Sequence, residues 1–554
     1  MTLSADFRFI TFLFIGLLLA ARLPAQELPE TDLSQIRCMT PLIDQLDEHR
    51  DQLPPDLLME MNALTQGVCH RPQTDHSHTS PSGRFILYYD LEGPDAVPSE
   101  DSNQSGVPDY IERAAFAADS SWNHLIAENG FVDPIPPVRP HEIYFRDFGF
   151  YGVNCPDEVG TTYTVVNNDF EGFPPNEHPK GDQIGALYVT IAHEFKHASQ
   201  YATNRRRCPS GFGNVELGCS AWIEMDAVMA EELVFDDVND YYHYIKTDLD
   251  SSIPSFQSIF GDPDIPIPVA YNHVTWKLYF AETLGAGFWA DVWERSIDSW
   301  EIPALDAIKN TLLEYGTTFE REQIHNLLWH LASGPDHSPQ NYGFRDRFNY
   351  PTPNFNAEFT VSDLKNIETP TVLRPLGGQF FIARPGAGAF GQPRFTLNHP
   401  DEGIAMGLLG YFRDGRVETL YASGRQAETT IQTDWNWENL HQVGMVAVNL
   451  DQQESNNFTV LIESVIADRI ALEPNYPNPF RDQTQIRFSL DRQTQVELTL
   501  HDLLGRQIRT LKNGSMPQGF HTVELDAREL SSGVYFYRLR TENRVESGKM
   551  MIIR

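Results

Sequence analysis

The chain has 554 residues, more than one hydrophobic core usually organises, so we expect about two to four domains. Hydrophobic residues make up 41% and aromatic residues 12% of the sequence, which excludes a globally disordered chain. The formal net charge of -36 disfavours binding to nucleic acid and to anionic membranes. This acidity fits solubility outside the cell, and a second interpretation is affinity for divalent cations.

The N-terminus has the features of a signal peptide, which we assign to residues 1–25. Arg8 precedes an apolar run over residues 9–21, and Ala25 supplies a small residue at the cleavage point. The mature chain would then start near Gln26. An uncleaved anchor is the alternative, although the run is short for a membrane span. No later stretch is apolar for long enough, so we expect no transmembrane segment in the mature chain.

Five cysteines are present, and an exported protein meets oxidising conditions in which disulfides form. The spacing suggests Cys38 paired with Cys69 and Cys208 paired with Cys219, which leaves Cys155 over. Five cysteines cannot all pair within one chain, and the sequence does not settle the connectivity. No CxxC pair occurs, so we do not expect a thiolate zinc site.

In chain order, the polar residues 26–80 come first, and we expect a pro-region or a small N-terminal cap. Their last part, the histidine-containing tract 72–81, is predicted to be a linker. A strand is predicted at 84–89, and a helix with an apolar stripe runs from about 109 to Asn129.

The next elements are a strand at 141–145, a helix at 181–202 and further helices between about 220 and 333. Strands followed by helices predict an α+β domain, which we assign to residues 81–350. Short β-rich runs separated by turn residues follow. They predict a β-sandwich accessory domain at 351–466 and a small C-terminal β-sandwich at 467–554.

The helix predicted at 181–202 contains the motif HEFKH, residues 193–197. Residues four apart on a helix share one face, so the imidazoles of His193 and His197 can reach a single Zn²⁺. Glu194 points beside the metal, where it can take a proton from water and pass it to a leaving amine. A pair of surface histidines on a helix is the alternative interpretation.

A catalytic zinc takes a third protein ligand and keeps one position open. Residues 221–232 read as a second helix, and Glu224 near its start is our preferred third ligand. Glu231 lies two turns later on the same face, as a rival ligand or a hydrogen-bond partner of one. Tyr271 and His273 open another predicted helix and are candidates to stabilise an oxyanion, with ordinary packing as the alternative.

HEFKH together with Trp222-Ile-Glu-Met-Asp-Ala227 resembles the gluzincin class of zinc peptidases, with one residue fewer between Trp222 and Glu224 than in that class. Residues 84–335 also resemble a family of secreted bacterial metalloproteases, through the loop 106–110, the HEF-x-H-A-x-Q helix and the Glu-x-x-Ala helix. The resemblance implies a zincin-like α+β domain that hydrolyses polypeptides with zinc.

Two positions depart from this pattern. Lys196 puts a charge inside the motif, which an outward face of the helix would tolerate. Val228 stands four residues after Glu224, where thermolysin-like enzymes have an acid, so the hydrogen-bond partners of the ligands are not predicted.

A possible structural calcium site precedes the first long helix. Residues 101–112 fit the twelve-residue EF-hand loop, with Gly106 at the sharp turn. A polar turn that caps the helix is the alternative. The candidate ligands are Asp101, Asn103, Ser105, the carbonyl of Val107, Asp109 and Glu112.

The last ~85 residues resemble the type A sorting domain of the type IX secretion system, over the whole segment. The matching marks are NYPNPF at 475–480, DLLG at 502–505, SGVYFYRL at 532–539 and KMMIIR at 549–554. His501 stands where a Tyr is usual. The resemblance implies a Gram-negative bacterium, passage through the periplasm, and release or surface attachment by the type IX machinery. A generic adhesive β-domain is the alternative.

These features predict a secreted zinc endopeptidase that acts on polypeptides and binds no nucleic acid. A surface adhesin with a silent or structural zinc site is the second hypothesis, with the middle sandwich as its binding domain. A zinc hydrolase of a non-peptide amide is the third, because the metal chemistry is shared.

Overall fold

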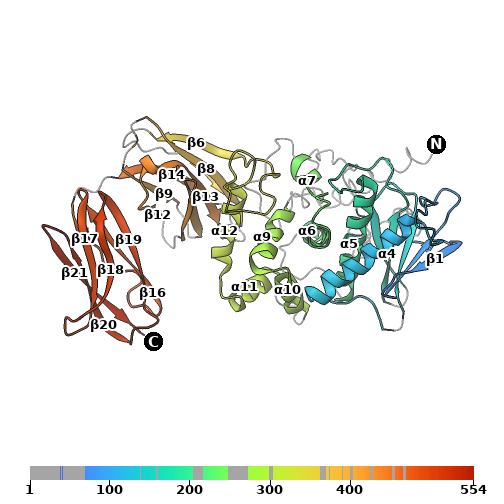
Figure 1. Cartoon of the computed structure of the whole chain (residues 1–554), viewed down its shortest axis with the longest axis horizontal. Coiled ribbons are helices and arrows are strands. Elements are labelled where there is room, and N and C mark those ends of the chain that lie inside the picture. The colour runs from blue at the N-terminus through green and yellow to red at the C-terminus, as the bar shows by residue number, and fades with distance from the viewer. Residues whose placement is uncertain are drawn as a thin grey trace, which may run out of the picture. The chain divides into compact units, whose positions relative to one another are not determined.

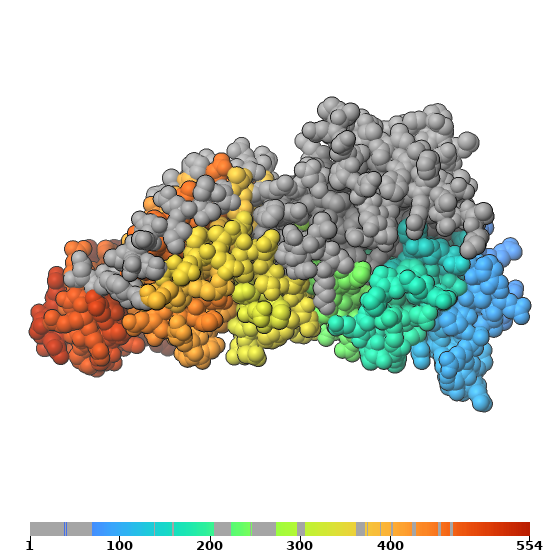
Figure 2. Space-filling view, turned by 90° about the horizontal axis from the view of Figure 1, so that it is seen from above, coloured from blue at the N-terminus to red at the C-terminus, as the bar shows by residue number. Residues whose placement is uncertain are grey.

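The computed structural model divides the chain into two compact units (Figure 1). The first contains the described residues up to Phe319, and the second those from Glu320 onward. Figure 2 shows their surface in the same colours. The signal peptide predicted at 1–25 lies outside the described residues. These are 38, 40, 69–137, 139–157, 160–203, 216–247, 273–297, 304–361, 370–373, 375–387, 389, 391–399, 403–423, 428–451, 456–465 and 469–553.

The first unit contains a five-stranded mixed sheet in the order β1-β2-β3-β5-β4. Strands β2, β3 and β5 are parallel, whereas the edge strands β1 and β4 are antiparallel to their neighbours. Every residue of β5 is buried, as expected for an inner strand. The strands are β1 (His76–Thr79), β2 (Phe85–Tyr89), β3 (His141–Arg146), β4 (Gly152–Pro156) and β5 (Thr162–Asn167).

The tract 72–81 is not simply a linker, because it contains β1. His76 pairs with Tyr89 in the register of β1 and β2, and the two rings stack with centroids 5.5 Å apart. A His-Ser-His-Thr run has no hydrophobic alternation, so only its backbone pairing with β2 defines it as a strand.

The helices of this unit are α4 (Asp109–Trp122) with its π-helical extension η3 (Asn123–Glu128), α5 (Asp182–Ala202), α6 (Glu216–Val234), α7 (Tyr242–Thr247), α9 (Val274–Leu284), α10 (Gly287–Ile297) and α11 (Ala304–Glu314). The strands predicted at 84–89 and 141–145 and the helix predicted at 181–202 are confirmed, whereas β1, β4 and β5 were not predicted. Every residue of α5 from Ile184 to Gln200 is buried, so α5 is a core helix surrounded by the rest of the unit.

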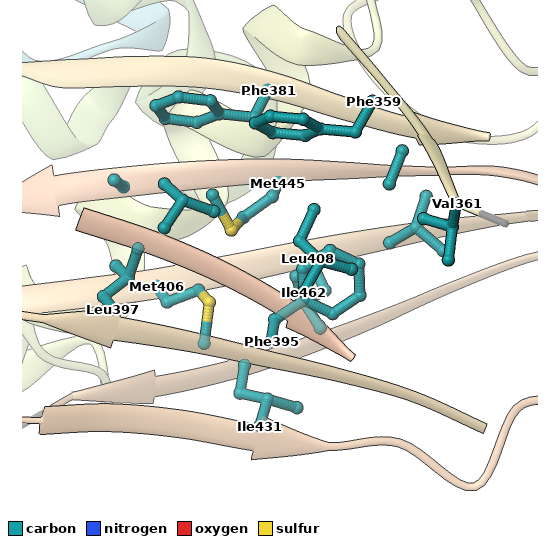
Figure 3. Close-up of a cluster of buried hydrophobic side chains, with 14 of the residues drawn as sticks. Phe359, Val361, Phe381, Phe395, Leu397, Met406, Leu408, Ile431, Met445 and Ile462 are labelled. Atoms are coloured by element: carbon teal, nitrogen blue, oxygen red, sulfur yellow. The ribbon is translucent and has the colours of Figure 1, made fainter. Parts of the chain in front are cut away.

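The second unit contains a β-sandwich of two sheets, in the orders β11-β10-β13-β8-β6 and β12-β9-β14-β7. Figure 3 shows side chains of the two sheets facing one another, such as Phe381 and Met445 against Phe395 and Ile462. The strands are β6 (Phe355–Val361), β7 (Pro370–Leu373), β8 (Gly378–Pro385), β9 (Gln392–Asn398), β10 (Ile404–Phe412), β11 (Val417–Ser423), β12 (Glu428–Gln432), β13 (Leu440–Asn449) and β14 (Asn456–Val465).

Helix α12 (Phe319–Leu331) packs on the outer face of the larger sheet of this sandwich. Leu328 and Leu331 are buried with Phe380 and Val446. A Cβ at Gly444 would lie 2.4 Å from Leu331 Cδ2, so a glycine is needed where the helix approaches. The predicted domain boundary at 350 therefore differs from the packing, in which α12 belongs with the sandwich rather than with the preceding domain.

A second sandwich follows, with sheets β15-β16-β19 and β18-β17-β20-β21 around a core that includes Leu498, Leu500 and Tyr537. His501, at the unusual position of the predicted sorting domain, is buried and bonds to Thr499 Oγ1 through Nε2 at 2.9 Å. The strands are β15 (Ala471–Leu472), β16 (Gln483–Leu490), β17 (Thr494–His501), β18 (Gln507–Met516), β19 (Gly519–Asp526), β20 (Gly533–Arg540) and β21 (Val545–Ile552).

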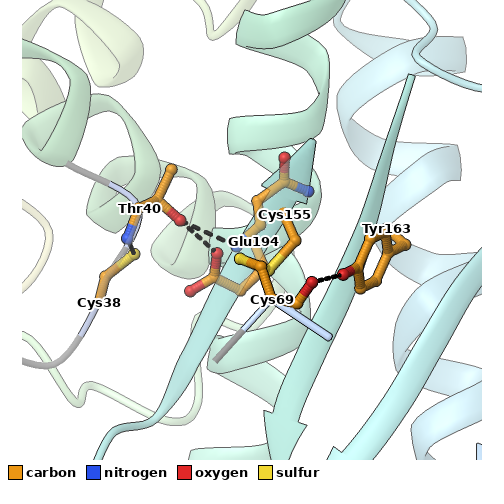
Figure 4. The surroundings of a disulfide bond; sticks show 7 residues. Cys38, Thr40, Cys69, Cys155, Tyr163 and Glu194 are labelled. Atoms are coloured by element: carbon orange, nitrogen blue, oxygen red, sulfur yellow. Dashed lines mark hydrogen bonds between the residues drawn. A yellow bond between two sulfur atoms is a disulfide. The ribbon is translucent and has the colours of Figure 1, made fainter. Parts of the chain in front are cut away.

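One disulfide joins Cys69 to Cys155 on β4, with their Cα atoms 5.5 Å apart (Figure 4). Cys38 is a buried free thiol. The predicted Cys38–Cys69 pair is therefore wrong, because proximity along the sequence does not reveal which strand a cysteine meets in the fold. The other predicted pair, Cys208 with Cys219, lies outside the residues whose side chains are described.

Among the described residues, no helix combines the length and the apolar composition that a membrane span needs.

We expect Cys69→Ala to lower the free energy of unfolding of the first unit by about 2–4 kcal/mol, because the disulfide closes a long loop. The measurement is thermal or urea unfolding with and without reductant. Reductant should destabilise the parent protein to the level of the variant and should leave the variant unchanged. Equal unfolding midpoints for the two proteins under oxidising conditions would contradict the bond.

Candidate metal centre

The buried helices α5 and α6 bring the predicted metal ligands together. His193 Nε2 lies 3.3 Å from Glu224 Oε2, and His197 Nε2 lies 3.0 Å from Glu224 Oε1. The two imidazole rings are 4.7 Å apart, and all three side chains are buried. The three side chains that the sequence predicted as metal ligands therefore lie together at one site.

The other nitrogen of each imidazole has a hydrogen-bond acceptor. His193 Nδ1 lies 2.6 Å from Glu231 Oε1, and His197 Nδ1 lies 2.8 Å from Gln200 Oε1. A carboxylate and an amide oxygen only accept, so each Nδ1 donates and each neutral ring keeps its lone pair on Nε2. Each Nε2 atom faces the Glu224 carboxylate, which has no proton to donate to it. Glu231, the rival ligand, therefore orients His193 from the far side of its ring.

The charges at this point favour a cation. Burial lowers the pKa of His193, but the carboxylates of Glu224 and Glu231 outweigh burial and raise it to about 10. Burial also raises the pKa of Glu224, but His197 and His193 outweigh burial and lower it to about 2. These carboxylates stabilise positive charge between the imidazoles, and a metal ion can supply that charge in place of a proton.

Cys38 is a fourth member of this group, which the sequence did not predict. One ligand atom from each of Cys38, His193, His197 and Glu224 lies within 4.8 Å of the others, an arrangement that can hold a metal ion. Sequence reasoning expected no thiolate ligand, since Cys38 has no second cysteine at metal-binding spacing.

Glu194 lies next to this group, where β4 approaches α5. A Cβ at Gly152 would lie 2.9 Å from Glu194 Cγ and 2.8 Å from Thr190 Cγ2, so only a glycine allows this approach. Glu194 Oε2 accepts a hydrogen bond from Thr40 Oγ1 at 3.2 Å, whereas Oε1 has no hydrogen-bond partner among the described residues (Figure 4). Burial raises the pKa of Glu194 above its usual value.

Lys196 is not on an outward face, contrary to the prediction, because α5 has none. Its side chain is 1% exposed, and its Nζ lies 2.6 Å from Asp226 Oδ2 on α6. Lys277 Nζ on α9 lies 2.7 Å from Asp226 Oδ1, and Trp293 Nε1 on α10 donates to Oδ2 at 2.6 Å. Burial lowers the pKa of Lys277 to about 8, although Asp226 opposes this shift.

Gln200 joins this ion cluster to the metal ligands. Its Oε1 faces His197, while its Nε2 donates to the carbonyl of Ile223 at 3.1 Å and to Asp226 Oδ2 at 3.3 Å. Gln200 and Glu231 thus act as the hydrogen-bond partners that Val228 cannot provide. Gln200 follows His197 by three positions on one helix face, which is a signal that sequence reasoning could have used.

The candidates for oxyanion stabilisation are not settled by the fold. His273 is buried at the residue before α9, a helix that packs against α6. Tyr271 lies outside the described residues. The catalytic role of both stays a prediction.

The loop predicted to bind calcium is held by its own hydrogen bonds. The Asp101 carboxylate accepts from the N–H groups of Ser105 at 3.0 Å and Gly106 at 2.9 Å, and Asn103 Nδ2 donates to Glu112 Oε2 at 2.7 Å. Gly106 has φ +85°, as a sharp turn requires. These bonds form a polar turn, but its side chains do not cap the helix: the N-cap residue of α4 is Pro108, without a side-chain cap bond, and Asp109 Oδ1 accepts from Ser102 N. Calcium binding by the predicted set, including the Val107 carbonyl and Asp109, stays a prediction.

We expect Asp226→Asn to lower the free energy of unfolding by about 3–5 kcal/mol, because two buried ammonium groups lose their carboxylate. Urea unfolding followed by tryptophan fluorescence measures this. Asp306→Asn, at an exposed position in the first turn of α11, is the matched control and should change stability little. Similar losses in the two variants would refute the role of the cluster.

The comparisons with known proteins identify one domain. Residues 475–554 match the family model described as "Secretion system C-terminal sorting domain". No curated protein matches the chain. Solved structures give only weak similarity, so they carry no argument about fold or activity. One is a beta-1,2-glucanase from Parabacteroides distasonis, with 8% identity, 30% of this chain and 28% of that chain covered, and a TM-score of 0.13.

Two others are a DUF4785 family protein from Legionella pneumophila and a beta-glucuronidase from Faecalibacterium prausnitzii. The first has 10% identity, 36% and 69% coverage of this chain and that chain, and a TM-score of 0.12. The second has 10% identity, 34% and 37% coverage, and a TM-score of 0.11. The chain spans less than two thirds of the length of the glucanase and of this glucuronidase. The C-terminal β-sandwich is a type IX sorting domain, and the chain is secreted by that system to the cell surface or the exterior.

Proposed function

We propose that the chain is a secreted zinc-dependent peptidase. In this proposal His193, His197 and Glu224 bind the zinc ion and Glu194 transfers the proton. The observation that carries the proposal is the orientation of two buried imidazoles, whose Nε2 atoms both face the carboxylate of Glu224. A second buried carboxylate follows directly after the first histidine, as proton transfer requires.

The donor set supports zinc among the common metals. Calcium and magnesium prefer oxygen ligands alone, whereas two imidazoles and one carboxylate are a usual set for catalytic zinc. Both buried Nε2 atoms face the Glu224 carboxylate, so a cation placed between them would contact two nitrogen lone pairs and a carboxylate oxygen. The residues present therefore fit a zinc ion.

When bound, zinc supplies Lewis acidity, which polarises a peptide carbonyl and makes water a better nucleophile at neutral pH. Glu194 takes the proton of the attacking water on its carboxylate. It then gives this proton to the amide nitrogen as the carbon–nitrogen bond breaks, so that a carboxylic acid and an amine leave. Burial raises the pKa of Glu194, which brings its basicity closer to neutral pH.

The surrounding residues keep the ligands in position during this reaction. Glu231 and Gln200 fix the ring planes of His193 and His197. The Asp226 cluster in turn fixes Gln200, so little reorganisation is needed when substrate binds. Secretion by the sorting domain places this activity outside the cell, where protein substrates are available.

We expect Glu194→Gln to keep its zinc and to lose casein hydrolysis by at least about 10²–10⁴-fold, because the amide cannot accept the proton. Zinc content by mass spectrometry and hydrolysis rates are measured on protein recovered from the medium. Glu294→Gln, at an exposed position on α10, is the control and should hydrolyse casein normally. Normal activity of Glu194→Gln would remove the mechanism. Zinc in a parent that hydrolyses no casein would point to a latent enzyme, a narrow substrate or the adhesin hypothesis.

We expect His197→Ala to lose zinc more completely than Gln200→Leu. Removal of an outer hydrogen-bond partner typically lowers metal affinity by about 10–100-fold, and loss of a ligand should exceed this. Competition with a chromophoric chelator measures both affinities. A full zinc complement in His197→Ala would refute the ligand assignment.

A further inference from the structure

Cys38 and Thr40 reach the metal centre from a part of the chain remote in sequence from its other residues. The sulfur of Cys38 belongs to the group in which one ligand atom of each residue lies within 4.8 Å of the others. Cys38 is buried and takes part in no disulfide. Catalytic zinc sites keep one position open, whereas structural sites fill all four. A sulfur in this place would close the position that two imidazoles and a carboxylate leave open.

Thr40 fixes this sulfur and also engages Glu194. Its backbone N–H donates to Cys38 Sγ at 3.3 Å, so the sulfur acts as an acceptor. Its hydroxyl donates to Glu194 Oε2 at 3.2 Å and accepts from Asn154 N at 2.9 Å (Figure 4). The Thr40 hydroxyl therefore bonds both to β4 and to the carboxylate of Glu194, the proposed proton acceptor.

The same segment lies on the free edge of the sheet. β4 is an edge strand, and Cys38 forms an isolated parallel bridge with Gly152. Gly152 is also the residue whose missing Cβ lets β4 approach Glu194. Extended peptides commonly bind proteins by adding a strand to such an edge. The chain's own segment therefore occupies the edge that could bind an extended substrate beside Glu194.

We propose that Cys38 and Thr40 hold the enzyme latent, with the Cys38 thiolate as the fourth metal ligand and Thr40 bonded to Glu194. This inference rests on the proposed function, because it requires a metal ion at the same centre. The thiolate is the metal-binding form of cysteine, and in this position it excludes water. Activation would require Cys38 to leave the metal position, its sulfur taking up a proton from solvent and leaving that position open to water. No oxidant or reductant is needed.

The disulfide determines which part of the chain leaves after cleavage. Cys69 is bonded to Cys155 on β4, so the chain from residue 69 onward remains attached to the sheet. A cut between residues 41 and 68 would separate Cys38 from this attachment. Cys38 and Thr40, the described residues of that segment, would then be attached through metal coordination and hydrogen bonds, from which they can dissociate.

Cobalt(II) in the full chain tests the inference directly. A thiolate ligand to cobalt gives intense near-ultraviolet charge-transfer absorption, which imidazole and carboxylate ligands do not give. We expect this band in the parent and its loss in Cys38→Ser and Cys38→Ala, with one cobalt still bound. If the open form of the parent is populated at about 1–10%, zinc-loaded Cys38→Ser should hydrolyse casein about 10–100-fold faster.

Thr40 has its own pair of variants. Thr40→Ser keeps the hydroxyl and should stay latent, whereas Thr40→Val loses the bond to Glu194 and should be more active than the parent. Absence of the sulfur band from a cobalt-loaded parent, or its persistence in Cys38→Ser, would overturn the inference and leave the metal centre intact. Failure of the parent and the Cys38 variants to bind cobalt or zinc would instead refute the proposed function.

Discussion

Helix α6 buries two carboxylates that lie two residues apart, and the fold of the first unit depends on the basic side chains that face them. Glu224 and Asp226 are both 0% exposed, and an unpaired buried charge would cost several kcal/mol. Residues two apart point to nearly opposite sides of a helix. Glu224 therefore faces the two imidazoles of α5, while Asp226 faces Lys196 and Lys277. Helix α6 carries one negative charge on each of two buried sides.

This constraint explains why the metal ligands are held so firmly. Asp226 contacts residues of α5, α9 and α10, so one carboxylate joins four helices behind the metal centre. Gln200 transmits this arrangement to His197 through two hydrogen bonds of a single amide group. His193 is oriented separately, by its hydrogen bond to Glu231. The centre is thus oriented by side chains that are themselves locked by packing, which is the condition for a preorganised site.

The parts of this site that the sequence predicted are those that depend on local geometry. The spacing of His193, Glu194 and His197 follows from helical periodicity alone. Glu224 was chosen because a helix was predicted to start near it, but α6 begins at Glu216 and Glu224 lies in its middle. Burial of Lys196 could not be predicted in this way, because its partner Asp226 is 30 residues away in the sequence, and Lys277, which shares that carboxylate, is 81 residues away. Helical periodicity assigned that lysine to solvent, whereas tertiary packing surrounds α5 on all sides.

The same distinction applies to the cysteines and to the N-terminal strand. Spacing favoured the Cys38–Cys69 pair, but loop closure is only weakly length-dependent, so the partner is set by the fold and Cys155 on β4 is chosen. Strand β1 was missed because its sequence lacks alternation and its existence depends on β2. By contrast, the two β-sandwiches of the second unit were predicted, since alternating or continuous apolar runs are local signals.

Strand β4 combines these long-range contacts into one functional edge. Cys69 is bonded covalently to Cys155 of this strand. Cys38 and Thr40 make weaker contacts with it, at Gly152 and Asn154. The two attachments differ in chemistry, so a single event can release one and leave the other. The edge beside Glu194 can then become free while the sheet keeps its disulfide. An edge strand that carries both a permanent and a releasable contact can therefore control access to the carboxylate without any change in the fold behind it.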